Sequence, residues 1–385
     1  MLRVSRALIA GIFSVSGAAL IGTMPASAES MQVGNATISA GAGVVRLTLP
    51  DIKFTQQADY GTGATIFKHE NEDIAWKYGW ALEGVGEVEV DGMFGVNTIG
   101  VRGFYADIED TTTLTCGANG GGSSLSVCSV TNIVDNPAMM NKFSLIDPFI
   151  NQSASVRTER EVDHWGIALE GKSGAPDALA ITSNTFLALG GDYRTIDQDI
   201  KIRGANGSGF NPEGIVGFNY SEDLDTDYWG AYLAAGADYE LPFFGGLTSG
   251  LGLKSSIRGQ VGVYYVDADY DGRYAANIIY GDPTASDSSS LSLSTDDVAV
   301  IAGVTLETQL PIGRRAALSL KSTYEYYSWV PDMQYNDYEI DGDDVTAGLD
   351  VGTRIGDDDA FSARTTANLT ILLGPDDVMP ARPYK

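Results

Sequence analysis

The sequence predicts an all-β fold, a transmembrane antiparallel up-and-down β-barrel of about twelve strands, with ten and fourteen as the alternatives. Three observations predict it. Apolar and polar residues alternate over stretches longer than an ordinary strand, the connections alternate between short and long, and the tryptophans gather toward the long connections. Together they are typical of a barrel that crosses a membrane with tilted strands.

The composition excludes several other classes of protein. With 24 Lys and Arg against 51 Asp and Glu, the 385-residue chain has a formal net charge of −27, so nucleic acid is not an expected partner. Its hydrophobic content of 44% is too high for a disordered acidic chain. Two cysteines can supply neither a disulfide-dense scaffold nor a four-thiolate zinc site.

Residues 1–28 are typical of a secretory signal peptide. Arg3 and Arg6 precede an uncharged stretch over 7–21, and residues 25–28 follow the A-x-A pattern of a cleavage site. Cleavage is expected near Ala28. The barrel with its long external loops is then expected over 29–373, followed by a C-terminal tail over 374–385.

The clearest strand lies over 251–265. There Val261 and Val263 share one face, while Lys254 and Arg258 share the other, a period of two. Ten further stretches show the pattern: 35–49, 74–90, 93–107, 157–170, 177–196, 226–240, 298–306, 318–326, 345–351 and 361–373. Single-chain bacterial barrels have an even number of strands. Because eleven is odd, either one more strand lies within 50–73 or 130–155, or one of these is false.

Charges recur on one face of these strands and are nearly absent from the other. A soluble β-sandwich would bury the apolar face, whereas a membrane barrel turns it toward lipid and lines its lumen with polar groups. The predicted lumen-lining residues are Lys77, Glu83, Glu87, Lys254, Arg258, Glu307, Lys321, Glu325, Asp350, Arg354 and Arg364. Side chains of both signs can either set up a field in an open pore or pair and fill a narrow one.

Short connections are expected near 90–92, 242–250, 310–313 and 356–358, and long polar ones near 108–154, 204–225, 272–294 and 331–342. This alternation is typical of short periplasmic turns and long external loops. All of the tryptophans, at positions 76, 80, 165, 229 and 329, fall toward the long connections, where a membrane interface would favour amphipathic rings.

In these features the chain resembles the outer-membrane β-barrel proteins of Gram-negative bacteria, in particular porin-like and autotransporter-type barrels without a passenger domain. The resemblance implies an integral protein of the bacterial outer membrane, in contact with membrane lipid and lipopolysaccharide. Because trimeric porins usually have more strands, it also favours a monomer. The end of the chain departs from the pattern, since Leu373 is followed by the tail rather than by a terminal aromatic residue.

Two motifs lie in the predicted external loops. Cys116 and Cys128 are expected to form a disulfide in an oxidising compartment, either as a surface staple or to fix a loop over the pore. Asp267, Asp269 and Asp271 open a calcium-loop pattern, but the Glu that would complete an EF-hand is missing. A weak Ca²⁺ site at the external rim remains one interpretation and a solvated acidic loop the other. No other cofactor is expected.

Catalysis is not expected. His164 lies near the predicted external end of a strand with Ser153 and Ser155 upstream, so a Ser–His pair at the rim is a third hypothesis only. The leading prediction is passive diffusion of small hydrophilic solutes or ions, with moderate cation selectivity because acidic residues surround the mouth. The alternative is a structural or surface-interaction protein with a plugged barrel and acidic, cation-binding loops.

Overall fold

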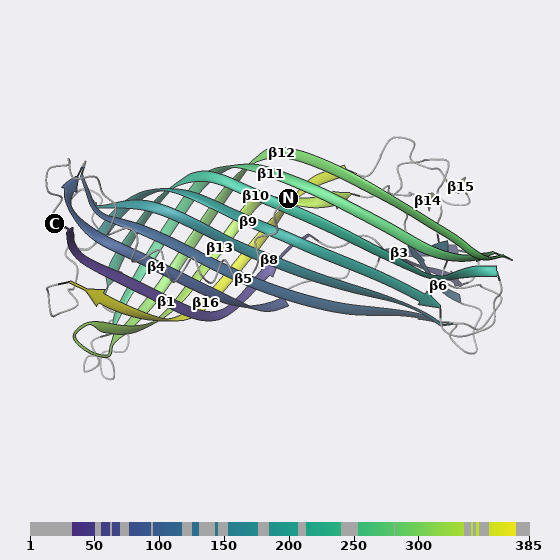
Figure 1. Cartoon of the computed structure of the whole chain (residues 1–385), viewed down its shortest axis with the longest axis horizontal. Helices are drawn as coiled ribbons and strands as arrows, with labels where there is room; N and C mark the ends of the chain where they lie inside the picture. The colour runs from purple at the N-terminus through teal and green to yellow at the C-terminus, as the bar shows by residue number, and fades with distance from the viewer. Residues whose placement is uncertain are drawn as a thin grey trace.

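Ten antiparallel strands close into a ring in the computed structural model of the chain (Figure 1). Around the ring their order is β1, β16, β13, β12, β11, β10, β9, β8, β5 and β4, so neighbouring strands are mostly consecutive in the chain. The predicted all-β, antiparallel, up-and-down fold is therefore confirmed. The structure describes residues 33–50, 55–61, 64–69, 77–93, 95–117, 125–130, 143–144, 153–175, 185–206, 213–239, 253–280, 282–334, 340–341, 344–345 and 354–374.

The barrel strands are β1 (Val33–Thr48), β4 (Lys77–Met93), β5 (Val96–Gly117), β8 (Ser153–Gly174), β9 (Thr185–Asn206), β10 (Glu213–Tyr239), β11 (Lys254–Tyr280), β12 (Asp282–Pro311), β13 (Ala316–Gln334) and β16 (Arg354–Leu373). A separate four-stranded sheet is formed by β2 (Thr55–Gly61), β3 (Ala64–His69), β6 (Leu125–Val130) and β7 (Phe143–Ser144). Its strands lie in the order β3-β2-β6-β7. Strands β14 (Ile340–Asp341) and β15 (Asp344–Val345) form a small hairpin. The predicted signal peptide and C-terminal tail lie outside the described residues, except for Gly374.

The ring closes with ten strands, one of the two alternatives to the predicted twelve, so twelve is not confirmed. The candidate stretch over 345–351 is not among the ten strands of the ring. The structure describes only its Val345, in β15, and the rest of it lies outside the described residues. The turn predicted over 356–358 is wrong, since β16 runs through it from Arg354 and pairs there with β13. Asp357 to Asp359 suggested a turn because they are acidic, yet they lie exposed along a continuous strand.

Several strands are far longer than a bilayer requires. Strands β10, β11 and β12 have 27, 27 and 30 residues, against roughly 9–11 for a tilted membrane-spanning strand. Much of the polar sequence predicted as loops over 204–225 and 272–294 is therefore strand. Acidic residues on the outer face hid the alternation there, although the inner face carries buried Tyr220, Leu224 and Tyr270.

The connections of the ring alternate in length only in part. Strand β10 follows β9 after 207–212 and β12 follows β11 after 281, where long loops were predicted over 204–225 and 272–294. Strands β12 and β13 are joined at 312–315, and β4 turns into β5 at Gly95, whose φ of 78° favours glycine. At the opposite end, the chain between β1 and β4 contains β2 and β3, and the chain between β5 and β8 contains β6 and β7. None of the described residues forms a helix long and apolar enough to cross a bilayer.

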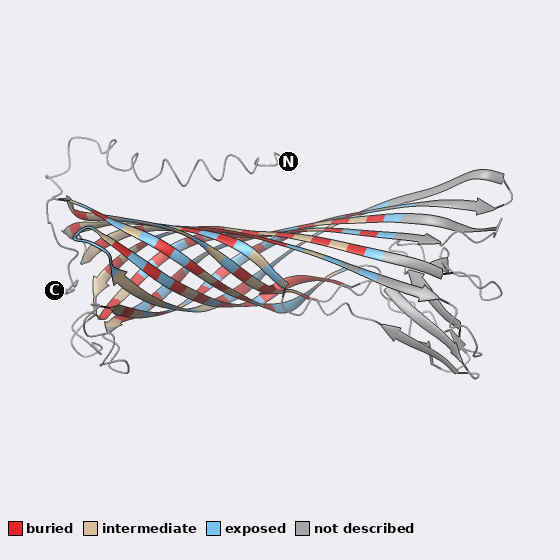
Figure 2. Ribbon diagram, turned by 90° about the horizontal axis from the view of Figure 1, so that it is seen from below, coloured by how far each residue is buried: buried red, intermediate tan, exposed pale blue. Residues whose placement is uncertain are grey.

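Buried residues alternate with more exposed ones along most of the barrel wall (Figure 2), although 103–108 in β5 are all buried. The exposed face is rich in large apolar side chains, among them Leu169, Leu189, Leu233, Val261, Val263, Val304, Leu320 and Ile371. The inner face carries buried Lys, Arg and Glu side chains. This arrangement is the inverse of a soluble β-protein and is expected of a wall that faces lipid.

An aromatic belt crosses the outer face where the apolar band ends. Trp165 stacks edge-on against Tyr193 at 5.2 Å between ring centroids, and Tyr193 lies 4.1 Å from Trp229. Trp80 similarly lies 5.2 Å from Tyr105. Rings of this kind favour a membrane interface. Trp329 is the exception, because it is buried on the inner face, and Trp76 lies outside the described residues.

Candidate functional site

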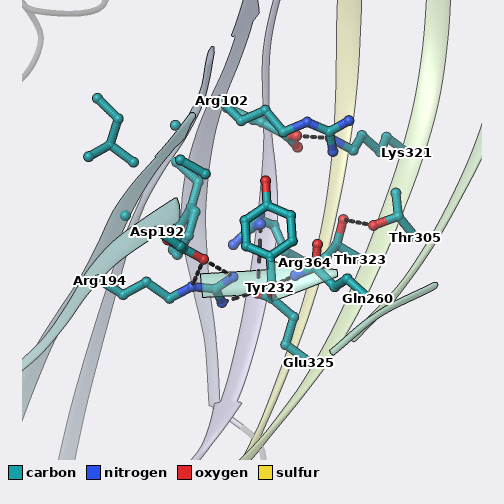
Figure 3. Close-up of a pocket in the computed structure, with 16 residues that line it drawn as sticks. Arg102, Asp192, Arg194, Tyr232, Gln260, Thr305, Lys321, Thr323, Glu325 and Arg364 are labelled. Atoms are coloured by element: carbon teal, nitrogen blue, oxygen red, sulfur yellow. Dashed lines mark hydrogen bonds and ion pairs between the residues drawn. The ribbon is translucent and has the colours of Figure 1, made fainter. Parts of the chain in front are cut away.

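The lumen at the level of the apolar band is crossed by a network of charged side chains, which we call the lumen network (Figure 3). The period of two along each strand turns every second side chain inward, and the closed ring brings distant strands face to face. A cavity of about 50 Å³ remains at the centre. Its charged lining residues are Glu83, Arg102, Asp192, Arg194, Lys321, Glu325 and Arg364.

Glu170 of β8 is the centre of one part of the network. Arg258 reaches it from β11 with Nη2 at 2.7 Å from Oε2 and Nη1 at 3.2 Å from Oε1. Arg102 and Lys172 approach Oε1 at 2.9 and 3.3 Å, and the hydroxyl of Tyr232 donates to Oε2 at 2.8 Å. This carboxylate is therefore fully buried and fully compensated.

A second pair crosses the ring from β4 to β13. Lys321 donates to Glu83, whose other oxygen accepts a hydrogen bond from the Thr366 hydroxyl at 3.2 Å. The two strands are three positions apart around the ring. Because both side chains are almost completely buried, the pair acts as a strut across the lumen.

Arg194 of β9 joins both sides of the barrel. Its Nε and Nη2 each lie 2.7 Å from Asp192, while Nη1 donates to Glu325 of β13 at 2.8 Å and to the hydroxyl of Tyr327 at 2.9 Å. Strands β9 and β13 are four positions apart around the ring. The guanidinium thus binds Asp192 of its own strand through Nε and Nη2 and reaches the opposite wall through Nη1.

An aromatic layer lies next to the network, toward the long end of the strands. Tyr228, Tyr264 and Tyr327 are each at most 1% exposed, and Tyr327 forms edge contacts with Tyr228 and His164. His164 shares a hydrogen bond of 2.9 Å with the Tyr327 hydroxyl. Apolar residues such as Ile196 fill the spaces between these rings. The three tyrosine rings and Ile196 therefore belong to one buried cluster inside the barrel.

The structure places the predicted lumen residues unevenly. Glu83, Arg258, Lys321, Glu325 and Arg364 are buried inside, and Glu87 pairs with Lys172. Lys254 and Glu307 are only half-buried, Arg354 is exposed, and the side chains of Lys77 and Asp350 lie outside the described residues.

Sequence reasoning missed five members of the network: Arg102, Glu170, Lys172, Asp192 and Arg194. Their strands alternate less cleanly, because glycines at 190 and 191 and the outward Tyr193 interrupt the pattern around Asp192 and Arg194. One signal could have identified them as inward-facing. All five have even residue numbers, as do the neighbouring inward residues of the same strands.

The acidic residues of the predicted calcium pattern lie on the outer wall rather than around the mouth. Asp267, Asp269 and Asp271 are exposed and follow one another at alternate positions of β11, so they are spaced along the strand by about 7 Å and do not converge as in a loop. Across β10 and β11, Asp225 faces Asp269 and Asp227 faces Asp267. In the part of the chain that the structure describes, no group of His, Cys, Asp or Glu could hold a metal ion.

Aspartates that face one another on adjacent strands of the outer wall raise one another's pKa values. Asp197 of β9 lies two residues beyond the aromatic belt and faces Asp225 and Asp163. Burial, reinforced by Asp225, Asp227 and Asp163, raises the pKa of Asp197 to about 7. Burial and the neighbouring aspartates likewise raise the pKa of Asp225 to about 6. Burial and the neighbouring rows of aspartates therefore oppose the ionisation of these two carboxyl groups.

The two cysteines lie on different sheets, Cys116 in β5 and Cys128 in β6. Their side chains fall outside the described residues, so the disulfide remains a prediction.

A closed antiparallel ring with an apolar outer band, an aromatic belt and a charged interior decides the class of fold. The chain has the fold of an outer-membrane β-barrel. No protein-family model matches it, and no curated protein matches its sequence. Solved structures that match it include bacterial outer-membrane proteins.

The protease OmpT of Escherichia coli is 11% identical, with 90% of this chain and 99% of that chain covered and a TM-score of 0.40. The translocator domain of the autotransporter NalP from Neisseria meningitidis is 7% identical, with 95% of each chain covered and a TM-score of 0.28. The monoaromatic hydrocarbon channel TodX of P. putida, in a deletion mutant, is 10% identical, with 94% of each chain covered and a TM-score of 0.24. At these identities the likeness concerns the fold alone.

The prediction that the chain is not an enzyme is contradicted by this comparison, because OmpT is an outer-membrane protease. An enzymatic role is not established by it either. The specific Ser–His hypothesis is wrong, since His164 is buried inside the barrel and Ser155 lies nine residues away on the same strand, about 30 Å at the usual rise.

Proposed function

We propose that this barrel is an outer-membrane channel of low conductance for ions and very small solutes, held nearly closed by the lumen network. The observation that carries the proposal is the charged, polar cavity in the middle of the membrane-spanning barrel. Buried ion pairs stabilise a fold no better than apolar side chains of similar volume would. An interior built only for stability has no need of them, whereas charged side chains that line a lumen are typical of ion pathways.

The size of the lumen limits the solute. The central cavity measures about 50 Å³, and one water molecule needs roughly 10–15 Å³ of such space. A few water molecules or one small ion fit, but a sugar does not. The proposal therefore narrows the predicted hydrophilic solutes to ions and molecules of comparable size.

We propose that the lumen network, rather than the acidic mouth, sets the ion preference. Moderate cation selectivity was predicted because acidic clusters were expected around the mouth. Asp223, Asp225 and Asp227 instead share the outer face of β10 with Trp229, which removes most of that support. The cavity is lined by four basic and three acidic residues, and fixed positive charge at a constriction favours anions.

Planar-bilayer recording tests the proposal. We expect small stepwise currents from purified barrels. Under a KCl gradient, the reversal potential should shift from zero toward the equilibrium potential of chloride. A shift of the reversal potential toward the equilibrium potential of potassium would instead support the predicted cation preference. A complete absence of steps in correctly folded protein would rule out the channel.

A second candidate is a surface protein whose barrel is permanently plugged, and the aromatic layer favours it. Tyr228 and Tyr327 are 0% exposed, as expected of a lumen that packed side chains fill. This candidate predicts no current even when the ion pairs of the network are removed. It also predicts that envelope integrity or attachment is lost on deletion of the external segments while the barrel remains folded.

A further inference from the structure

Arg364 of β16 is the one member of the cavity lining whose charge is poorly compensated. It is only 5% exposed, yet its Nε and Nη1 atoms have no hydrogen-bond partner. Its closest carboxylate contact is a distance of 3.9 Å from Nη2 to Oε2 of Glu325. The remaining contact is with the face of Phe104, 4.0 Å from the ring centroid.

The acidic groups around the cavity are already paired with other cations. Glu83 accepts from Lys321, Asp192 accepts from Arg194, and Glu325 accepts from Arg194 at 2.8 Å. Over the whole lumen network six basic residues lie among five acidic ones, so one positive charge is left over. The basic ones are Arg102, Lys172, Arg194, Arg258, Lys321 and Arg364, and the acidic ones are Glu83, Glu87, Glu170, Asp192 and Glu325. Guanidinium donors buried without partners are costly, so the geometry calls for an additional acceptor beside Arg364.

We infer that the cavity beside Arg364 binds one small monovalent anion, such as chloride. The volume of about 50 Å³ accommodates a halide ion but excludes larger anions such as sugar phosphates. Arg102 and Lys321 line the same cavity, and each is paired with a carboxylate, Arg102 with Glu170 and Lys321 with Glu83. The inference concerns the site of the proposed function, but it does not depend on conduction, because a sealed barrel would still need a counterion there.

Ordered water is the competing occupant. Oε2 of Glu325 also lacks a hydrogen-bond partner, so a water molecule placed between it and Arg364 would satisfy both groups without an anion. A halide would instead have to lie on the side of Arg364 away from this oxygen. The two occupants differ in electron count and in their response to halide concentration, which makes them separable.

Crystals of the purified full barrel grown in sodium bromide distinguish them. The expected result is an anomalous bromine peak within hydrogen-bond distance of the Arg364 guanidinium. The peak should be absent in Arg364→Gln and present in Arg354→Gln, a matched change at an exposed position of the same strand. A water-sized peak without anomalous signal in the wild-type crystal would overturn the inference.

A solution measurement covers the case in which Arg364→Gln does not fold. The unfolding temperature of the wild-type barrel should rise when sodium bromide replaces sodium gluconate at constant ionic strength. Arg364→Lys keeps the positive charge but loses the planar set of guanidinium N–H donors. In this variant the bromide concentration that gives half of the rise in unfolding temperature should be about tenfold higher. An equal response of both proteins, or no response, would contradict the site. A bromide peak in a barrel that passes no current would refute the channel alone.

Discussion

Glu83 and Lys321 show how individual residues build the interior of this barrel. They come from strands that pair with different neighbours, and 238 positions separate them in the sequence. Their pairing inside the lumen removes two charges from contact with water, which is costly unless each has a partner. The pair is therefore sensitive to the loss of one member and tolerant of the loss of both.

This asymmetry yields a prediction at the residue scale. Lys321→Met should destabilise the folded barrel by roughly 3–5 kcal/mol, because Glu83 would remain as a buried charge. The double variant Glu83→Gln/Lys321→Met should recover most of that loss. The measurement is the urea midpoint of the folded band in unheated gel electrophoresis. Equal destabilisation by the single and double variants would show that the pair is not a coupled unit.

At the scale of the strands, inward glycines accommodate the rings of the aromatic side chains on neighbouring strands. Gly230 of β10 is in register with Tyr264 of β11, and a Cβ built on it would lie 2.4 Å from the ring. Gly190 of β9 has the same relation to Tyr232 of β10. Such pairs let large rings lie flat against the wall and so close the lumen.

Adding one methyl group tests this arrangement. Gly230→Ala should displace Tyr264 and destabilise the barrel by about 1–3 kcal/mol, as overpacking usually does. Gly191→Ala is the matched control, since Gly191 is exposed and its Cβ would meet only one atom, at 3.9 Å. Heat-induced unfolding followed by gel mobility reads both variants. A larger loss for Gly191→Ala would exclude the proposed role of the inward glycine.

The strands also show what could be predicted from the sequence. The alternation of polar and apolar residues located the ten barrel strands. It does so because successive side chains point in turn toward the polar lumen and toward lipid. It failed at Asp357 to Asp359, where consecutive acidic residues resemble a turn. It could not identify the partners of Arg194 or Arg258, because these depend on which walls the closed ring brings together.

At the scale of the whole molecule, the outer wall beyond the membrane carries rows of aspartates in register. Asp163, Asp197, Asp225 and Asp269 face one another on four successive strands. Like charges directly opposite on adjacent strands are destabilising. Because burial and these neighbours raise the pKa of Asp197 to about 7, folding favours its protonated form.

The sign of the pH dependence follows. The stabilising contribution of protonated Asp197 is complete below about pH 4, which is the pKa of an aspartate in the unfolded chain. It is lost as the pH rises through about 7, the pKa of Asp197 in the folded barrel. Asp197→Asn should therefore unfold at the same temperature as wild type near pH 4. Above pH 7 it should be more stable by on the order of 1 kcal/mol.

The control is Asp357→Asn, because Asp357 faces Pro331 rather than another acid. Thermal unfolding from pH 4 to pH 8 measures the difference between each variant and wild type. A constant difference across this range for Asp197→Asn would exclude coupling between the rows.

The most direct test of the central claim, that the lumen network holds a conducting barrel nearly closed, is the single-channel current of Glu83→Gln/Lys321→Met beside wild type in planar bilayers. Removing one strut without leaving an unpaired charge should raise the current per step severalfold, roughly threefold or more. Leu320→Val, a lipid-facing change beside Lys321, should leave the current unchanged. Silence of both wild type and the double variant, with the fold intact, would contradict the claim and identify the barrel as permanently sealed.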